Sequence, residues 1–245
     1  MKKRTLQTLR TTLYGLALLL VGSFGLIGCG EDDPVTPPKD YGFSSVTFLH
    51  ANPGRTTGIA FFLGDTTLIS ADASEQPQYE GTFKKTVPNG ESQKYTVKDL
   101  SGAELASTTA AHDSSQYTMV IYSGNSTASD VFVAATKKIS SSGGGKVAVR
   151  FVHAAKDAGP RSLKIGAADG ASIASNVSYK GASGAFISVD VATETLWIVD
   201  ESGAKAAISV PVNLSVGEVW TIVFHGSEGA LTPDLKWRGT PIADK

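Results

Sequence analysis

The chain has 245 residues, 41% of them hydrophobic, so it is long enough to bury one large core or two smaller ones and is not a disordered chain. Lysine and arginine together number 22, and aspartate and glutamate number 23. No cluster of basic residues offers to neutralise phosphates, so nucleic acid is excluded as the expected partner.

Residues 1–28 have the pattern of a secretory signal peptide. Lys2, Lys3, Arg4 and Arg10 precede an apolar run from Leu13 to Ile27. This run is shorter than the roughly 20 residues that a membrane-spanning helix needs. We therefore expect the leader to be removed, which leaves 18 basic residues against 23 acidic ones and a net charge of −5.

The single cysteine, Cys29, follows Leu26-Ile27-Gly28, and this segment resembles the lipobox of bacterial lipoproteins. The resemblance implies cleavage before Cys29 and lipidation of Cys29, which holds the mature protein on a membrane. We expect a lipid-anchored cell-envelope protein, with the outer membrane of a Gram-negative bacterium as its membrane and the periplasmic or surface face left open. With one cysteine, no intramolecular disulfide can form, so packing must stabilise the body.

Residues 29–42 comprise the lipidated cysteine and a segment rich in proline and acidic residues. This segment has almost no apolar side chain to bury, which is typical of an extended tether.

The rest of the chain contains an internal repeat. Val46-Thr-Phe-Leu-His-Ala51 matches Val149-Arg-Phe-Val-His-Ala154, and Tyr117-Thr-Met-Val-Ile-Tyr122 matches Trp220-Thr-Ile-Val-Phe-His225, both at a spacing of 103 residues. We interpret these matches as a tandem duplication, with a first repeat at 43–139 and a second at 146–245. The serine- and glycine-rich run at 140–145 is expected to be the linker.

Within each repeat, apolar residues alternate with polar or small ones between turn signals, which is typical of half-buried strands. Val147, Val149 and Phe151 share one face of such a strand, and 103–111 is also expected to be a strand despite its alanines. Six or seven short strands in each unit of about 95 residues predict an all-β protein with two tandem antiparallel β-sandwich domains. Immunoglobulin-like and transthyretin-like sandwiches both fit this pattern.

The second repeat resembles the domain-of-unknown-function 4397 family. The resemblance is carried by Val149-Arg-Phe-Val-His-Ala-Ala-Lys-Asp-Ala158, then Leu163-Lys-Ile165, then Ser175-Asn-Val-Ser-Tyr179. The first repeat keeps Phe48 and His50 of this pattern but has no asparagine-valine-x-tyrosine stretch. The resemblance implies a secreted or lipid-anchored bacterial protein with tandem β-sandwich copies and no established activity.

No catalytic residue is predicted, because the cysteine is used for lipidation and no Gly-x-Ser-x-Gly elbow occurs. His50, His112, His153 and His225 show no metal-ligand spacing, so no metal or cofactor is expected. Each histidine is expected to pack at a core edge, with a ring nitrogen bonded to a loop carbonyl.

Four aromatic residues are candidates for a carbohydrate-stacking surface. Trp197 and Trp220 lie inside apolar strands and are expected in the core; the fourth candidate is Tyr179. Trp237, between basic residues, is the best candidate of the four for an exposed ring, although a packing role is favoured for it as well. The candidate binding loops contain Asp157, Asp169 and Asn176.

The predicted function is that of a non-enzymatic binding or adhesion module. Its partner is expected to be an envelope protein, a polysaccharide or a host surface, because the anchor, tether and tandem β-modules accompany no catalytic motif. Two alternatives are a structural spacer in an envelope assembly and a periplasmic enzyme or metal-dependent binder with a loop-built site.

Overall fold

The computed structural model describes residues 42–56, 58–71, 77–125, 127–139, 144–190, 195–230 and 236–244. The predicted signal peptide, Cys29 and the tether up to residue 41 lie outside these residues, as do positions 140–143 of the predicted linker. Residues 41–245 form one compact unit.

The described residues form strands and no helix, which confirms the predicted all-β class. No described helix is therefore long and apolar enough to cross a membrane. The strands of the first sandwich are β1 (Phe43–Ala51), β2 (Ile59–Leu63), β3 (Thr66–Ile69), β4 (Thr82–Pro88), β5 (Gln93–Asp99), β6 (Glu104–Ala110), β7 (Gln116–Gly124) and β8 (Ser129–Lys137). Those of the second are β9 (Lys146–His153), β10 (Arg161–Ile165), β11 (Ser172–Val177), β12 (Ile187–Asp190), β13 (Thr195–Val199), β14 (Ile208–Pro211), β15 (Val219–His225) and β16 (Arg238–Ala243).

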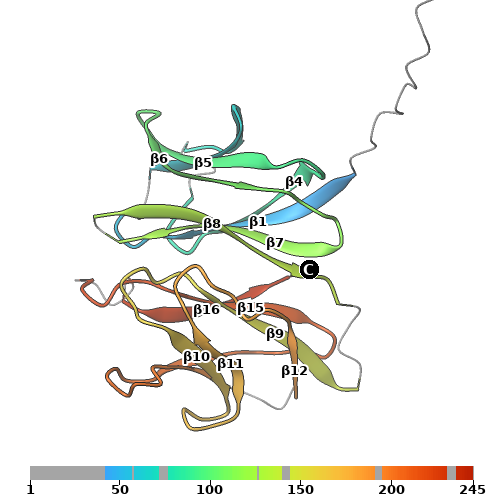
Figure 1. The fold of residues 1–245 in the computed structure, drawn as a ribbon, viewed down its shortest axis with the longest axis vertical. Coiled ribbons are helices and arrows are strands. Elements are labelled where there is room, and N and C mark those ends of the chain that lie inside the picture. Colours follow the sequence, from blue (N-terminus) through green and yellow to red (C-terminus); the bar gives the residue numbers. More distant parts are fainter. Residues whose placement is uncertain are drawn as a thin grey trace, which may run out of the picture. The chain divides into compact units, whose positions relative to one another are not determined.

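The two sandwiches have the same strand order. Figure 1 labels β1 and β4–β8 of the first sandwich and β9–β12, β15 and β16 of the second. The first contains the sheets β4-β1-β7-β8 and β3-β2-β5-β6, and the second contains β12-β9-β15-β16 and β11-β10-β13-β14. Each strand of the first sandwich therefore has a counterpart at the same place in the second. The alanine-containing segment 103–111 forms a strand, β6, as predicted.

Two pairs of strands are parallel, β1 with β7 and β9 with β15, although we expected antiparallel pairing throughout. The five strands between β1 and β7 give the chain enough length for the crossover that a parallel pair requires. A constant-type immunoglobulin domain has its first two strands in one sheet, whereas β1 and β2 lie in different sheets, so the constant-type immunoglobulin order does not fit.

The strand register corrects one of the two sequence matches. Val120 lies opposite Phe48, and Ile222 lies opposite Phe151, so β7 and β15 correspond at a spacing of 102 residues rather than 103. Adjacent residues of a strand face opposite sides, so this shift changes which side chains are equivalent. Ser123, not Tyr122, is the counterpart of His225.

Three apolar clusters hold the structure together. Phe48, Ile59 and Val120 belong to the cluster inside the first sandwich, and Phe151 and Ile222 belong to that inside the second. A third cluster joins the outer faces of two sheets, one from each sandwich; it contains Leu49, Ala51, Met119, Ile121, Phe132, Ala134, Val152, Ala154, Val223 and Ile242. The sandwiches are thus packed directly on each other.

Candidate functional site

A hollow of about 270 Å³ opens at one end of the second sandwich, where three loops meet. The loops are those between β9 and β10, between β13 and β14, and between β15 and β16. Eleven residues line it: Asp157, Gly159, Pro160, Arg161, Asn176, Asp200, Glu201, Ser202, Lys205, Glu228 and Trp237. We call this the Trp237 hollow. In such a site, the aromatic ring can contact a ligand while the charged and polar side chains fix the orientation of that ligand.

Trp237 is held in one orientation by contacts on several sides. Its ring is half-buried against the core, with its centre 6.2 Å from that of Phe224. Its indole nitrogen donates a hydrogen bond of 2.8 Å to Oδ1 of Asp157, and Oδ2 of Asp157 accepts another from Ser227. Such an acceptor orients the indole N–H. The ring is therefore a fixed surface rather than a mobile one.

Arg161 forms the floor of the hollow and is 4% exposed. The guanidinium lies 5.2 Å from the Trp237 ring, within the range of a cation–π contact. Nη1 donates to the carbonyl oxygens of Gly159 (3.2 Å) and Pro160 (3.0 Å) and lies 3.7 Å from Oδ2 of Asp200. This buried charge is thus compensated on several sides, as burial of a cation requires.

Asp200 is fixed as an ionised acceptor. Its Oδ1 accepts hydrogen bonds from the backbone amide of Ser202 (3.0 Å) and from its hydroxyl (2.6 Å). The Ser202 hydroxyl, with a smaller contribution from Arg161, holds the pKa of Asp200 below its usual range. At the rim, Lys205 pairs with Glu228, and its Nζ lies 5.9 Å from the Trp237 ring.

The first sandwich has a counterpart to this hollow, lined by Gly54, Arg55, Glu104, Leu105, Asn125, Thr127, Ala128 and Ser129. Arg55 lies 3.9 Å from Asp99, which matches the pairing of Arg161 with Asp200. Asp99 also accepts bonds from the amide and hydroxyl of Ser101, as Asp200 does from Ser202. No aromatic ring is among the described residues that line this counterpart. Trp237 is therefore the feature that distinguishes the second hollow.

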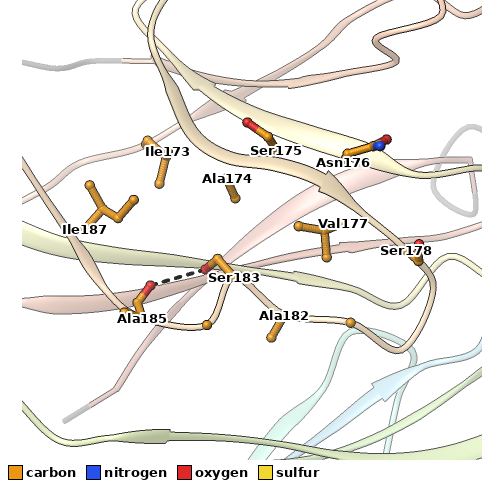
Figure 2. A pocket seen from close by; sticks show the side chains of 12 residues that line it. Ile173, Ala174, Ser175, Asn176, Val177, Ser178, Ala182, Ser183, Ala185 and Ile187 are labelled. Carbon is orange, nitrogen blue, oxygen red and sulfur yellow. Dashed lines mark hydrogen bonds between the residues drawn. The ribbon is translucent and has the colours of Figure 1, made fainter.

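A further hollow of about 450 Å³ lies between β11 and the segment leading to β12. Figure 2 shows that mostly small side chains line it, with Ser183 Oγ bonded to the carbonyl of Ala185 at 3.4 Å. Its described lining carries no charged side chain and no aromatic ring. This surface offers less chemistry for recognition than the Trp237 hollow.

Three of the predicted binding residues meet in the Trp237 hollow. Asp157, Asn176 and Trp237 all line it, although Trp237 is half-buried rather than exposed. Asp169 does not, since it lies exposed in the turn between β10 and β11. Tyr179 lies elsewhere and bonds to Ser123 and Asp130.

The other two tryptophans lie outside the hollow. Trp220 packs against the core as predicted, and its ring nitrogen donates to Glu218 at 2.9 Å. The prediction for Trp197 was wrong, because Leu196 and Ile198 face the core and the intervening Trp197 faces outward. Its ring nitrogen donates to the carbonyl of Gly166 at 3.1 Å.

Sequence reasoning missed Arg161, Asp200 and Lys205. A signal for one of them was present, because Asp99-Leu100-Ser101-Gly102 and Asp200-Glu201-Ser202-Gly203 repeat a turn that fixes a carboxylate. That the arginine lies beside this carboxylate depends on the fold and could not be read from spacing.

The histidines have structural partners. His153 contacts the carbonyl of Gly159 through Nε2 at 2.9 Å, which confirms the predicted loop bond for this residue. His225 bonds to Tyr79 and Thr240, whereas His112 bonds to Tyr95. Within the described ranges, no group of three or more histidine, cysteine, aspartate or glutamate side chains is arranged to hold a metal ion.

The fold and the hollow define a pair of β-sandwiches with a loop-built surface site. Comparison with known proteins found no matching protein-family model and no matching curated protein, so the resemblance to the domain-of-unknown-function 4397 family stays a prediction. Among solved structures, the chain is similar to a family 26 carbohydrate-binding module from Eubacterium rectale in complex with maltoheptaose, at 12% identity and a TM-score of 0.24, over 81% of this chain and 95% of that one. It is also similar to a Bacteroides uniformis protein whose proposed role is cell adhesion, at 10% identity and a TM-score of 0.22, over 83% of this chain and 99% of that one.

Proposed function

We propose that this protein is a non-catalytic carbohydrate-binding protein of the bacterial cell envelope, anchored by lipid at Cys29, with the Trp237 hollow as its ligand site. The observation that carries the proposal is the fixed indole of Trp237 among ionised and amide groups. The apolar C–H face of a sugar packs on an aromatic ring, and its hydroxyl groups bond to carboxylate, amide and ammonium groups. Asp200, Asn176 and Lys205 supply these groups.

A partner with many hydroxyl groups fits the hollow better than a purely apolar one, since most of the lining is charged or polar. The ligand would contact a small area, so the affinity of one site is expected to be modest. A repeating polysaccharide compensates for this, because many anchored copies bind one chain together.

Affinity electrophoresis of the chain from residue 30 onward, in gels containing soluble envelope or plant polysaccharides, tests the binding proposal. We expect at least one polysaccharide to retard the protein, and Trp237→Ala to weaken the retardation about tenfold or more. Trp197→Ala is the matched control, since Trp197 is also partly buried but lies outside the hollow. Equal retardation of the Trp237→Ala variant and the unmodified protein would reject the site.

The rim variant Lys205→Ala guards against a folding defect in Trp237→Ala. Lys205 has an exposed charged end paired with Glu228, so its loss is expected to weaken binding without changing the circular dichroism spectrum. Release of reducing ends from the retarding polysaccharide would contradict the non-catalytic part of the proposal and favour the enzyme alternative.

Anchoring and location are tested separately, by protease treatment of intact cells that carry the protein or its Cys29→Ala variant. We expect the unmodified protein in the membrane fraction and the variant in a soluble fraction. Loss of the body from intact cells would place it on the surface. Digestion that occurs only after the outer membrane is permeabilised would place it in the periplasm.

A further inference from the structure

The two sandwiches are docked through a face that is nearly symmetric. Its apolar centre contains residues from equivalent positions of the two sandwiches. Leu49 of β1 corresponds to Val152 of β9, and Ile121 of β7 corresponds to Val223 of β15. The same surface of each sandwich thus meets the other, which is the arrangement of a twofold dimer interface. Here both halves belong to one chain.

Two loops with the same conformation reach across the docking face. Tyr79-Glu80-Gly81 and Tyr179-Lys180-Gly181 each place their middle residue at positive φ, 67° at Glu80 and 65° at Lys180. The amides of Glu80 and Lys180 donate to the carbonyls of His50 and His153, which are counterparts in β1 and β9. These loops therefore occupy equivalent places in the two sandwiches.

Each tyrosine bonds to a residue near the end of β7 or β15 in the opposite sandwich. The hydroxyl of Tyr79 lies 2.9 Å from Nδ1 of His225, and that of Tyr179 lies 2.7 Å from Oγ of Ser123. Since Ser123 and His225 are counterparts, the two contacts are related by the same approximate twofold axis. The central loop residues lie beside these contacts.

The charges break this symmetry in a regular way. Glu80 of the first sandwich pairs with Arg238 of the second, whereas Lys180 of the second pairs with Asp130 of the first at 2.6 Å. Asp130 lies opposite Ser123 in its sheet, and Arg238 lies opposite His225, so Asp130 and Arg238 are counterparts. At these two positions the first sandwich thus carries acids where the second carries bases, and Lys156 of the second sandwich also pairs with Asp130 at 2.6 Å.

We propose that this exchange of charges is a pairing code, which makes the first sandwich dock on the second and prevents either from docking on a copy of itself. A pair of first sandwiches would bring Glu80 against Asp130 at both sites, and a pair of second sandwiches would bring Lys180 against Arg238. Like charges held together across an interface oppose binding, so both homotypic pairs are disfavoured while the mixed pair is favoured. The partner that this face fits is the complementary sandwich.

Selective pairing matters when many copies lie close together on one membrane, as the proposed lipid anchoring implies. Neighbouring copies present the same apolar docking face whenever a pair opens, and a face that accepted its own kind would link chains into aggregates. Mixed pairing restricts the choice, and the short connection between β8 and β9 gives the partner in the same chain the higher effective concentration.

Cleavage of the connection in the folded protein tests the code. A protease site placed within residues 140–145 of the chain from residue 30 onward is cut after folding, and the products are weighed by native mass spectrometry. We expect complexes that contain one first and one second sandwich. Homotypic pairs, or separation of the unmodified fragments at micromolar concentration, would overturn the proposal.

Charge variants of the cleaved protein separate the code from packing. Glu80→Lys with Asp130→Lys makes both faces basic and is expected to raise the dissociation constant about 100-fold. Lys156 of the second sandwich also pairs with Asp130, at 2.6 Å, so adding Lys156→Glu, Lys180→Glu and Arg238→Glu inverts the code and is expected to restore most of the affinity, even if the double variant folds poorly. Failure of the fivefold variant to pair, or unchanged affinity of the double variant, would overturn the proposal.

The matched control exchanges an ion pair away from the docking face. Lys94 and Glu104 pair at 3.0 Å between β5 and β6, in the sheet on the far side of the first sandwich. Lys94→Glu with Glu104→Lys is expected to leave the dissociation constant within about twofold of the unmodified value. A rise comparable with that of the Glu80 and Asp130 variant would overturn the assignment to the docking face.

Discussion

Arg150 is a fully buried charge at the boundary between the sandwiches. Its Nε donates to Thr221 at 2.6 Å, its Nη1 donates to Thr136 of the first sandwich at 2.8 Å, and its Nη2 lies 3.8 Å from Asp244. Desolvation raises the pKa of Asp244, and the attraction of Arg150 opposes this rise. Each member of the pair therefore makes burial of the other tolerable.

We expect Arg150→Met to lower the free energy of unfolding by about 3 kcal/mol, because it leaves Asp244 buried without its cation. Urea unfolding at pH 7 measures the loss. Arg150→Met combined with Asp244→Asn should regain much of it, since no uncompensated charge then remains. A loss below about 0.5 kcal/mol in the single variant would show that solvent reaches the site.

A second prediction concerns pH and the buried histidines. Desolvation lowers the pKa of His225 to about 3 and that of His50 to about 4, with Arg238 adding to the shift of His225. Unfolding raises both towards the ordinary 6.5, so the unfolded chain takes up protons first as the pH falls. The contribution of these two histidines to stability is therefore present above their unfolded pKa of 6.5 and is lost as the pH falls towards their folded values, about 4 for His50 and about 3 for His225.

The expected loss between pH 7 and pH 5 is about 2 kcal/mol for each of these histidines. Urea midpoints at the two pH values measure it. Burial also lowers the pKa of His112 and His153, so His225→Gln removes one of several contributing groups. It should reduce the difference between the midpoints without abolishing it, although the variant is less stable at pH 7. An unchanged difference would mean that other groups, such as the carboxylates, cause the pH dependence.

At the scale of elements, the two tyrosine loops bind the sandwiches together with equivalent bonds. We expect Tyr79→Phe and Tyr179→Phe each to lower the free energy of unfolding by about 1 kcal/mol, because each removes a hydroxyl that bonds across the docking face. Tyr179→Phe should cost somewhat more, since it also removes the bond to Asp130. The two bonds share no atoms, so the double variant should show nearly additive losses in urea unfolding. A loss confined to one loop would contradict the equivalence of the two.

Alternation of side chains predicted the strands because it reports directly on which residues face a core. Val149, Phe151 and the repeat match around Phe48 were sufficient for the class and the duplication. The one-residue error at β7 and β15 arose because both strands are apolar on two faces, one towards the sandwich core and one towards the other sandwich. When both faces of a strand are apolar, the alternation of side chains does not show which residues face the sandwich core.

The same limit applies to the loops. The sequence alone does not reveal that Tyr79-Glu80-Gly81 is the counterpart of Tyr179-Lys180-Gly181, although both contain tyrosine and glycine at the same spacing. Their distances from His50 and His153 differ by three residues, so a fixed offset misses them. Asp157 and Trp237 could be chosen as loop candidates, but their mutual hydrogen bond joins residues far apart in the chain.

For the whole molecule, the third apolar cluster and the bonds of Arg150 imply that the sandwiches unfold together. The three tryptophans of the chain, Trp197, Trp220 and Trp237, all belong to the second repeat. Tryptophan fluorescence therefore reports on the second sandwich, whereas far-ultraviolet circular dichroism reports on both. We expect the two thermal transitions to coincide at pH 7.

A destabilising change in the first sandwich makes this test decisive. Ile59 is fully buried in the first core, and Ile59→Ala should cost about 2–5 kcal/mol. If the docked pair is one cooperative unit, the tryptophan transition shifts to lower temperature together with the circular dichroism transition, although no tryptophan lies near Ile59. If the tryptophan transition stays in place while part of the circular dichroism signal is lost earlier, each sandwich unfolds independently, and the docking face contributes little to stability.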